Sequence, residues 1–224
     1  MHRNAAGALA LAMTLLSLAG AAPASAGAKL EVYGLRMVPT NPDSRQYSRP
    51  GWGAGVQGVV PIPGTADLLA GVAGVEIVNL LSSTKVFQDD LTGLRVEQQT
   101  SQNYGRFFLG TQMGAHGAGF LRPYGGVNLA LVWYGIGTDV VVPDDSDRER
   151  DIRQHLGGRD ELAFGWDANA GVDLNFNDRW GIDVGARWLH SYGVPQQLGD
   201  GAITIEPGYL QAKVGFVVGA RSFR

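Results

Sequence analysis

The feature that most limits how this chain can fold is a strict alternation of apolar and other residues over Leu162–Phe176. One parity carries the long apolar side chains, and the other carries small residues, asparagines and two carboxylates. A period of two residues is that of a β-strand whose two faces meet different surroundings. A soluble barrel buries its apolar face inside, whereas a membrane barrel turns that face to lipid and keeps polar groups in its lumen.

The same rhythm recurs along the chain and predicts an all-β fold with eight strands. We expect these strands at Lys29–Pro39, Gly51–Val60, Asp67–Leu80, Asn103–Ala115, Phe120–Ile136, Glu161–Phe176, Trp180–Tyr192 and Gly208–Ser222. Tight turns are predicted at Pro61–Ala66, His116–Gly119 and Asn177–Arg179, and longer loops at Thr40–Pro50, Leu81–Gln102, Gly137–Asp160 and Gly193–Pro207. Short turns at one rim and long loops at the other are typical of antiparallel up-and-down transmembrane barrels, whose strand number is even.

The N-terminus has the three parts of a secretory signal peptide. Arg3 lies in a short polar start, Ala5–Ala22 is mainly Ala, Leu and Met, and Ala24–Ala26 has the A-x-A form of a cleavage site. We therefore expect residues 1–26 to be removed and residues 27–224 to form one barrel domain. No later segment has the roughly 20 unbroken apolar residues of a membrane helix, so any membrane crossing would have to use strands.

Composition limits the kinds of partner that the chain can have, and a narrow barrel would explain its glycine content. The chain has no cysteine, which a lipid anchor would require at the cleavage site. Its formal net charge of −3 argues against nucleic acid as a partner. Its 33 glycines would weaken an ordinary sheet, but inward glycines leave room for large neighbours in a narrow barrel. We expect a monomer without a cofactor.

Aromatic residues fall near both ends of the predicted strands. Those near the long loops are Trp52, Tyr104, Trp133, Trp166, Trp188 and Tyr209, and those near the short turns are Phe120, Phe176, Trp180 and Phe223. Aromatic rings at two levels are typical of the two interfaces of a bilayer.

The inward faces of the predicted strands carry charges of both signs. The acidic members are Glu76, Asp167, Asp173 and Asp183, and the basic members are Arg106, Arg122, Arg187 and Lys213. Charges in so narrow a lumen must pair. They would form a structural plug, a narrow polar conduit, or a gate made when pairs exchange partners. The plug is favoured, because side chains normally fill an eight-stranded interior.

The first strand is ambiguous in the assignment of its faces. Leu30 and Val32 share one parity, whereas Leu35 and Met37 share the other. A bulge at Gly34 would switch the faces and explain this pattern.

A second candidate site is His190 and Ser191 at the outer end of the seventh strand, with Glu206 in the last loop. A histidine, a hydroxyl and a carboxylate at this rim suggest a hydrolase acting on lipid A, with Ser191 as nucleophile and His190 as base. The segment resembles the lipid A 3-O-deacylases, in which the nucleophilic serine follows the histidine by two residues. Here Tyr192 occupies that place, and adjacent strand residues point to opposite faces, which argues against the hydrolase.

A third candidate is a divalent-cation site at Asp144, Asp145 and Asp147, close to where lipopolysaccharide phosphates would lie. The spacing lacks the glycine turn and terminal glutamate of an EF-hand loop. We therefore interpret the charge run Asp144–Asp151 as a solvated loop. His116 stands alone in its turn and is not interpreted as a metal ligand.

Three segments together resemble the small bacterial outer-membrane β-barrel family, which includes OmpA-type, OmpX-type and OmpW-type barrels. They are FLRPYGGVNLAL at Phe120–Leu131, GWDANAGVDLNFNDRWGIDVGARW at Gly165–Trp188, and the last strand YLQAKVGFVVGARSF. The resemblance implies an outer-membrane location, lipid and lipopolysaccharide as surroundings, and insertion by the barrel-insertion machinery. Family members commonly end on an aromatic residue, whereas here Phe223 is penultimate and Arg224 is last.

These observations favour a non-enzymatic outer-membrane barrel with a structural or porin-like role in the passage of small solutes. A surface adhesin or ligand-binding barrel that acts through its long loops stays open as an alternative, as does the lipid A hydrolase.

Overall fold

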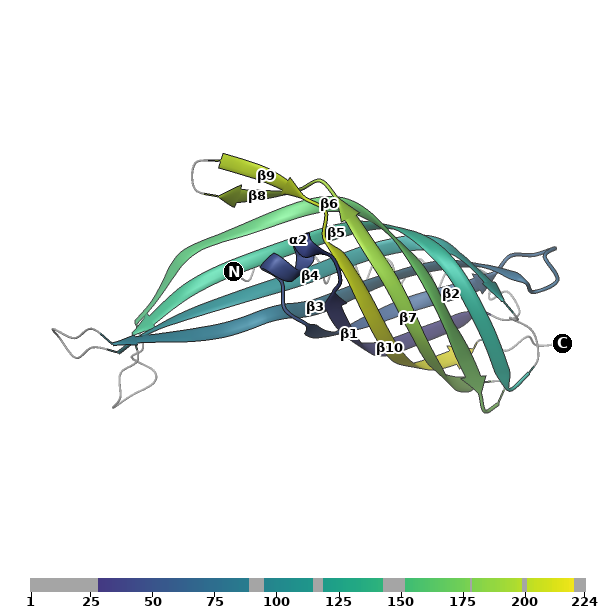
Figure 1. Cartoon of the computed structure of the whole chain (residues 1–224). Coiled ribbons are helices and arrows are strands. Elements are labelled where there is room, and N and C mark those ends of the chain that lie inside the picture. Colours follow the sequence, from purple (N-terminus) through teal and green to yellow (C-terminus); the bar gives the residue numbers. More distant parts are fainter. Residues whose placement is uncertain are drawn as a thin grey trace.

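The computed structural model describes residues 28–88, 95–114, 119–142, 152–177, 179–198 and 201–219. Within them, eight antiparallel strands close into a barrel in the order β1-β10-β7-β6-β5-β4-β3-β2 (Figure 1). The barrel strands are β1 (Lys29–Pro39), β2 (Gly51–Pro61), β3 (Leu69–Gln88), β4 (Arg95–Gly114), β5 (Leu121–Val142), β6 (Ile152–Asn175), β7 (Trp180–Tyr192) and β10 (Gly208–Gly219). The predicted eight-stranded barrel is confirmed. Among the described residues, no helix is long and apolar enough to cross a membrane.

The first and last strands close the ring. β1 pairs with β10 from Lys29↔Gly219 to Pro39↔Tyr209 without a break in register. β1 also pairs with β2 continuously past Gly34. The predicted bulge at Gly34 is therefore wrong.

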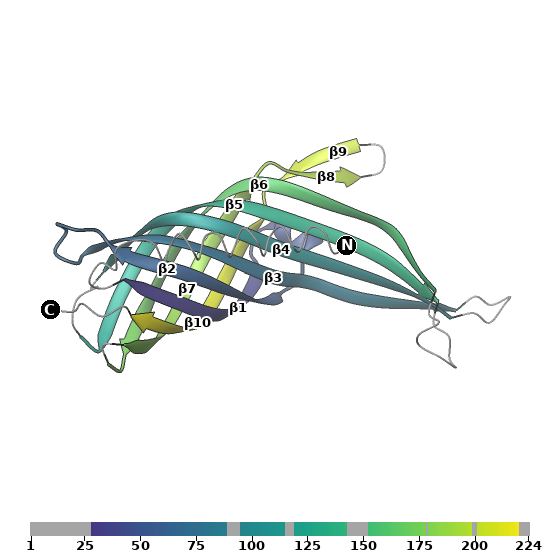
Figure 2. The ribbon, with the colours of Figure 1, turned by 180° about the vertical axis from the view of Figure 1, so that it is seen from behind.

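Four neighbouring strands run far beyond the others at one end of the barrel. β3 and β4 pair as far as Gln88↔Arg95, and β5 and β6 as far as Val142↔Ile152. Figures 1 and 2 show β3–β6 projecting together as a curved sheet past the ends of β1, β2, β7 and β10. We call this part, residues 81–88, 95–102, 136–142 and 152–163, the extension, and the end of the barrel that bears it the extended end.

The extension corrects two loop predictions. Most of the described parts of Leu81–Gln102 and Gly137–Asp160 are strand, not loop. Polar side chains lie on the extension beside apolar ones, such as the Thr100 and Thr138 hydroxyls that meet at 3.3 Å. Buried apolar positions are few here, although Val141 is one of them, so the two-residue pattern fades while the backbone ladder continues.

The two remaining connections at the extended end carry short elements. Helix α2 (Pro42–Tyr47) begins after Asn41, whose side chain accepts a hydrogen bond of 2.9 Å from the Ser44 amide. Pro42 fits the first turn because its missing N–H would have no helical partner. Between β7 and β10, strands β8 (Val194–Leu198) and β9 (Gly201–Ile205) form a separate hairpin, seen beside β6 in Figure 1.

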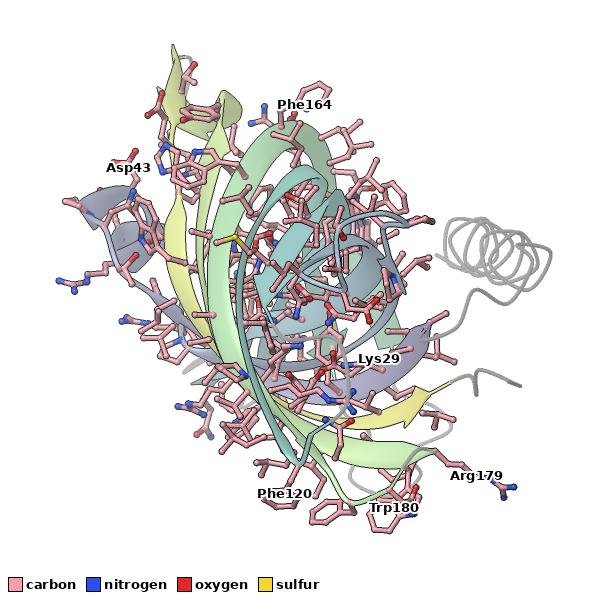
Figure 3. The ribbon with its side chains drawn as sticks, turned by 90° about the vertical axis from the view of Figure 1, so that its right-hand side faces the viewer. Lys29, Asp43, Phe120, Phe164, Arg179 and Trp180 are labelled. Carbon is pink, nitrogen blue, oxygen red and sulfur yellow. The ribbon has the colours of Figure 1, made fainter. Side chains whose placement is uncertain are left out.

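The outer surface of the barrel is apolar. Leu129 and Phe164 are each 73% exposed, and the other outward positions of β5, β6 and β10 follow the predicted parity. Figure 3 shows Phe120, Phe164 and Trp180 pointing away from the barrel. On β1 the alternation is clean, with Glu31, Leu35 and Met37 buried inside.

Two residues predicted for the aromatic belt lie inside the barrel instead. Tyr104 and Tyr209 are both 1% exposed, and their rings lie 5.9 Å apart, centroid to centroid. Tyr134 joins them, with its ring 5.3 Å from that of Tyr104. Tyr104 shares the parity of Arg106, so its position follows from the strand register. We call Tyr104, Tyr134 and Tyr209 the tyrosine layer.

Candidate functional site

The middle of the barrel interior is organised around one carboxylate, Glu76 on β3. It accepts hydrogen bonds from Arg106 Nε at 2.6 Å, from the Tyr33 hydroxyl at 2.6 Å and from Gln211 Nε2 at 3.0 Å. Arg187 forms a further ion pair with it. These groups come from five strands, so this one buried carboxylate ties opposite walls of the barrel together.

A second carboxylate continues the same cluster. Asp167 on β6 is fully buried and accepts hydrogen bonds of 2.8 Å from Arg106 Nη1 and from Asn128 Nδ2. Arg106 therefore bridges Glu76 and Asp167, and Arg187 reaches across to Gln57. Because each charge faces an opposite charge or an amide, the cost of burying it is largely offset. We call Glu76, Arg106, Asp167 and Arg187 the central charge layer.

A separate set of ion pairs lies closer to the short-turn end. Lys213 Nζ lies 2.7 Å from Glu31 Oε1 and 2.7 Å from Asp183 Oδ1. Gln57 Nε2 also donates to Glu31 at 2.5 Å, which links this set to the central charge layer. The interior charges thus form a connected network along the barrel axis.

Asp173 and Arg122 complete the predicted set at the short-turn end. Asp173 pairs with Lys29 from β1. Arg122 is opposite Asp173 in the β5–β6 register, but its Nε donates instead to the Gly119 carbonyl at 3.1 Å. Arg122 is less buried than the other members and lies apart from the two ion-pair clusters.

Aromatic rings and glycines fill the space between the charges. The guanidinium carbons of Arg106 and Arg187 lie 4.4 and 4.6 Å from the centroid of the Phe108 ring. A Cβ added to Gly74 would come within 2.4 Å of this ring. Likewise, a Cβ added to Gly55 would lie 2.5 Å from the ring of Tyr33. Inward glycines therefore let large side chains reach the barrel axis.

The prediction from sequence missed several members of the network. Lys29 and Glu31 lie on the strand whose faces were ambiguous. Gln57 was not assigned, and Gln211 was placed inward by its parity but was not counted because it is uncharged. The signal that could have placed Glu31 was its parity with Leu35 and Met37, the two apolar residues that pointed inward. Glu31, Leu35 and Met37 can share the inward face because the two ends of the barrel interior differ in polarity.

The predicted hydrolase residues lie on opposite sides of the barrel wall. His190 faces outward, with Nε2 3.6 Å from Glu206 Oε2 and its ring 4.6 Å from that of Tyr192. Ser191 is buried inside and accepts a hydrogen bond of 3.0 Å from the Tyr134 hydroxyl. With His190 on the other side of the wall, the pair lacks the geometry of an activated nucleophile.

The remaining candidate residues lie outside the described residues. These are Asp144, Asp145, Asp147, His116, Phe223 and the predicted signal peptide. Among the residues that are described, no group of three histidine or acidic side chains is arranged to hold a metal ion.

Comparison with known proteins establishes the fold. Neisserial surface protein A shares 13% sequence identity with this chain, at a TM-score of 0.52, over 87% of this chain and 98% of that protein. A major outer membrane protein from Thermus thermophilus gives 11% identity and a TM-score of 0.46, covering 86% of this chain and 99% of its own. Ail from Yersinia pestis shares 9% sequence identity with this chain at a TM-score of 0.43, over 86% of this chain and 99% of Ail.

No protein-family model matches the chain, and no curated protein matches its sequence. The fold is that of the small outer-membrane β-barrels, as the sequence resemblance predicted. A likeness at this identity carries the architecture alone, so function has to be argued from this chain's own residues.

Proposed function

We propose that this chain is an integral barrel of a bacterial outer membrane with a closed lumen, and that it acts at the cell surface through its extension. The observation that carries the proposal is the contrast between a barrel interior filled by side chains and four strands that continue well beyond the barrel. An open general porin would need a clear, water-filled lumen instead.

The apolar outer band supports membrane insertion. On β5 it runs from Leu121, which is 58% exposed, to Trp133. At about 3.4 Å per residue this is roughly 40 Å along the strand. A strand tilt of about 45° brings the height to nearly 30 Å, which matches the hydrocarbon core of a bilayer. Exposed Leu, Val and Phe at this density would be unfavourable in water.

The interior supports a closed lumen. Glu76, Arg106 and Arg187 are 2–4% exposed, and their ion pairs span the barrel. Phe108 lies between the two guanidinium groups. An ion that crosses this layer must first break buried ion pairs, which is costly.

The extension supports action outside the membrane. Beyond Trp133, β5 continues to Val142, roughly 30 Å at about 3.4 Å per residue. Its surface carries polar contacts suited to water, such as His155 Nδ1 at 2.6 Å from Asp139 Oδ1. The edges of β3 and β6 have no strand partner in the described part of the extension, and Phe87 is 51% exposed there. Exposed edges and side chains of this kind are suited to binding a partner.

Slow porin-like passage is the second candidate. Arg106 Nη2, Arg187 Nε and Gln211 Oε1 are buried without a hydrogen-bond partner among the described residues. Unsatisfied groups inside a charge layer favour exchange between alternative pairings. Such exchange would admit small ions at a low rate.

The experiment that tests the proposal is conductance of the refolded residues 27–224 in a planar bilayer, with insertion verified separately. We expect a silent membrane, and external protease should cleave the extension in intact cells. Discrete conductance steps would contradict the closed lumen and favour the porin-like candidate. Recovery of the protein from the soluble periplasm alone would contradict the membrane assignment. For the hydrolase, lipid A from cells expressing the chain should keep all its acyl groups.

A further inference from the structure

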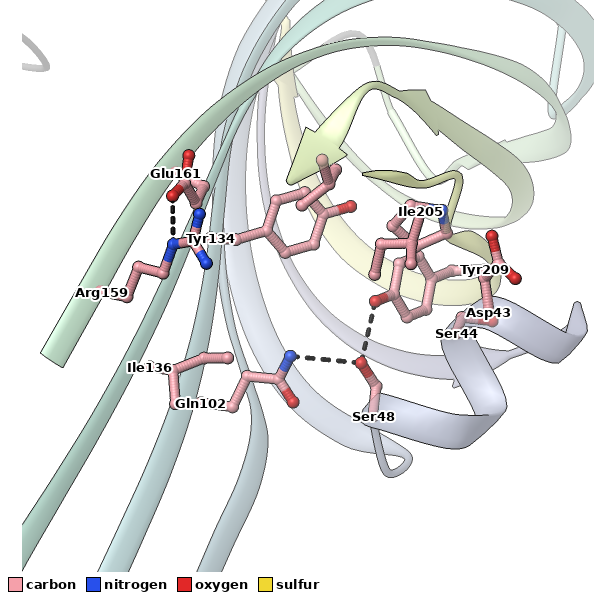
Figure 4. Close-up of a pocket in the computed structure, with 12 residues that line it drawn as sticks. Asp43, Ser44, Ser48, Gln102, Tyr134, Ile136, Arg159, Glu161, Ile205 and Tyr209 are labelled. Atoms are coloured by element: carbon pink, nitrogen blue, oxygen red, sulfur yellow. Dashed lines mark hydrogen bonds and ion pairs between the residues drawn. The ribbon is translucent and has the colours of Figure 1, made fainter. Parts of the chain in front are cut away.

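A pocket lies inside the barrel at the extended end, between the tyrosine layer and the base of the extension. It encloses about 440 Å³, including the part open to solvent. Figure 4 shows its walls, which come from α2, from β4–β6, from β8 and β9, and from β10.

The pocket walls are mainly apolar and aromatic. Val194 and Ile205 close one side and are 4% and 7% exposed. The rings of Tyr134 and Tyr209 line the side toward the barrel, and Ile136 adds to the wall. These side chains suit a short hydrocarbon stem.

One buried polar side chain in this wall, Gln102, uses only part of its hydrogen-bonding capacity within the described residues. Gln102 is 5% exposed, and its Nε2 donates to Ser48 Oγ at 3.3 Å. Ser48 Oγ also meets the Tyr209 hydroxyl at 3.0 Å, and the Tyr134 hydroxyl is used by Ser191. Gln102 Oε1, in contrast, is buried with no hydrogen-bond partner in the described part of the chain. A ligand N–H would satisfy this carbonyl oxygen and remove the cost of leaving it unpaired.

The charges around the pocket favour a cation. Asp43, Glu161 and Arg159 line it, and because Arg159 and Glu161 pair with each other, the carboxylate of Asp43 gives the lining a net negative charge. Tyr134 and Tyr209 line the same pocket, and aromatic rings of this kind attract ammonium groups. An anionic ligand would meet the carboxylate of Asp43 and the carbonyl oxygen of Gln102, while the one basic residue of the described lining, Arg159, is paired with Glu161.

We propose that this pocket binds a small primary amine with a short apolar stem, whose ammonium group donates to Gln102 Oε1. The site goes beyond the surface role proposed above and does not depend on it. Binding is measured in the folded protein, whether or not the barrel conducts, so failure of one proposal leaves the other standing.

The test is a titration of the isotopically labelled, refolded protein in phosphatidylcholine nanodiscs, followed by NMR. The probes are n-butylamine, n-butanol and butyrate, which have the same stem and different head groups. We expect n-butylamine to shift the Gln102 side-chain amide and the signals of Tyr134 and Tyr209 at concentrations at least tenfold lower than the other two. Equal shifts from n-butanol, or no shift from n-butylamine, would overturn the proposal.

Variants separate the site from general effects on the fold. Gln102→Leu keeps the approximate size and removes the acceptor, and should weaken n-butylamine binding at least tenfold. Gln98→Leu, on the same face of β4 but outside the pocket, should leave binding unchanged. Glu161→Gln keeps the shape of the pocket and should reduce the preference for the amine over the alcohol. Binding unaffected by both Gln102→Leu and Glu161→Gln would place the amine elsewhere and refute the site.

The ammonium group could come from a free amine or from a lipid headgroup. A second set of nanodiscs that contains phosphatidylethanolamine distinguishes these sources. Shifts at Gln102 without added probe would identify the headgroup, and shifts only after n-butylamine is added would identify a free amine.

Discussion

Two layers fill the barrel interior and differ in what holds them. The central charge layer joins β3, β4, β6 and β7 through buried ion pairs around Glu76 and Asp167. The tyrosine layer joins β4, β5 and β10 through ring contacts and single hydroxyl bonds. Removing one partner from the central charge layer leaves a buried charge unpaired. Removing one from the tyrosine layer only removes a neutral contact. The two layers should therefore respond to substitution on different scales.

Conductance should show the largest difference between the central charge layer and the tyrosine layer. Replacing Glu76, Arg106 and Arg187 together by alanine removes three of the four charges of the central charge layer and much of the side-chain volume there. We expect discrete conductance steps in a planar bilayer. Tyr104→Ala is the matched variant in the other layer and should leave the membrane silent, because the charge layer stays intact. Conduction by Tyr104→Ala alone would show that the tyrosines form the seal.

The single substitution Glu76→Ala should have the largest effect on stability. It leaves Arg187 and one side of Arg106 buried without their carboxylate, a loss of about 3–5 kcal/mol in the free energy of unfolding. Urea unfolding in lipid vesicles measures it. Asp160→Ala removes an exposed carboxylate that accepts from Trp133, and should cost no more than about 1 kcal/mol. Equal losses in the two variants would refute the assignment of the charge layer as the main support.

Gly74→Ala tests whether the inward glycines are required for packing. The added methyl group would lie 2.4 Å from the Phe108 ring and 2.7 Å from the Val56 carbonyl oxygen. We expect a loss of about 1–3 kcal/mol by the same unfolding assay. Gly71→Ala, on the outward face of the same strand, meets nothing closer than 3.9 Å among the described residues and is the control. Equal losses in the free energy of unfolding for the two variants would mean that the interior side chains shift to accommodate the methyl group.

Tyr209→Phe should have the smallest effect. It keeps the ring in the tyrosine layer and removes only the hydroxyl that meets Ser48 at 3.0 Å. The expected loss is about 1 kcal/mol. A loss as large as that of Glu76→Ala would show that the two layers do not differ in the way described.

The sequence predicted the membrane-facing parts of the fold well because lipid outside and packed side chains inside impose a two-residue period. β7 has the predicted bounds, Trp180–Tyr192, since its whole length lies in such surroundings. The parts of β3–β6 beyond the barrel lost that period, because both of their faces leave the lipid. Their ladder hydrogen bonds come from the backbone and leave no trace in residue type.

The candidate site was predictable only where the inside of the barrel is polar. Asp167, Asp183, Arg187 and Lys213 were found by parity because they oppose apolar neighbours that face outward. Tyr104 and Tyr209 were misplaced because the interior near the extended end is apolar and aromatic, so that apolar residues there do not mark the lipid side. The unpaired oxygen of Gln102 depends on contacts between β4, β10 and Ser48, the residue after α2, that no local pattern encodes.

The pairing of β1 with β10 has a consequence for biosynthesis. These two strands lie at opposite ends of the barrel sequence, yet each is the other's neighbour. An emerging chain therefore carries an open edge on β1 until its final strand arrives, and unpaired edges of this kind invite aggregation. Closure is the last event that the topology permits. A chain cut short before Gly208 would keep seven strands in a sheet that has no means of sealing itself from lipid.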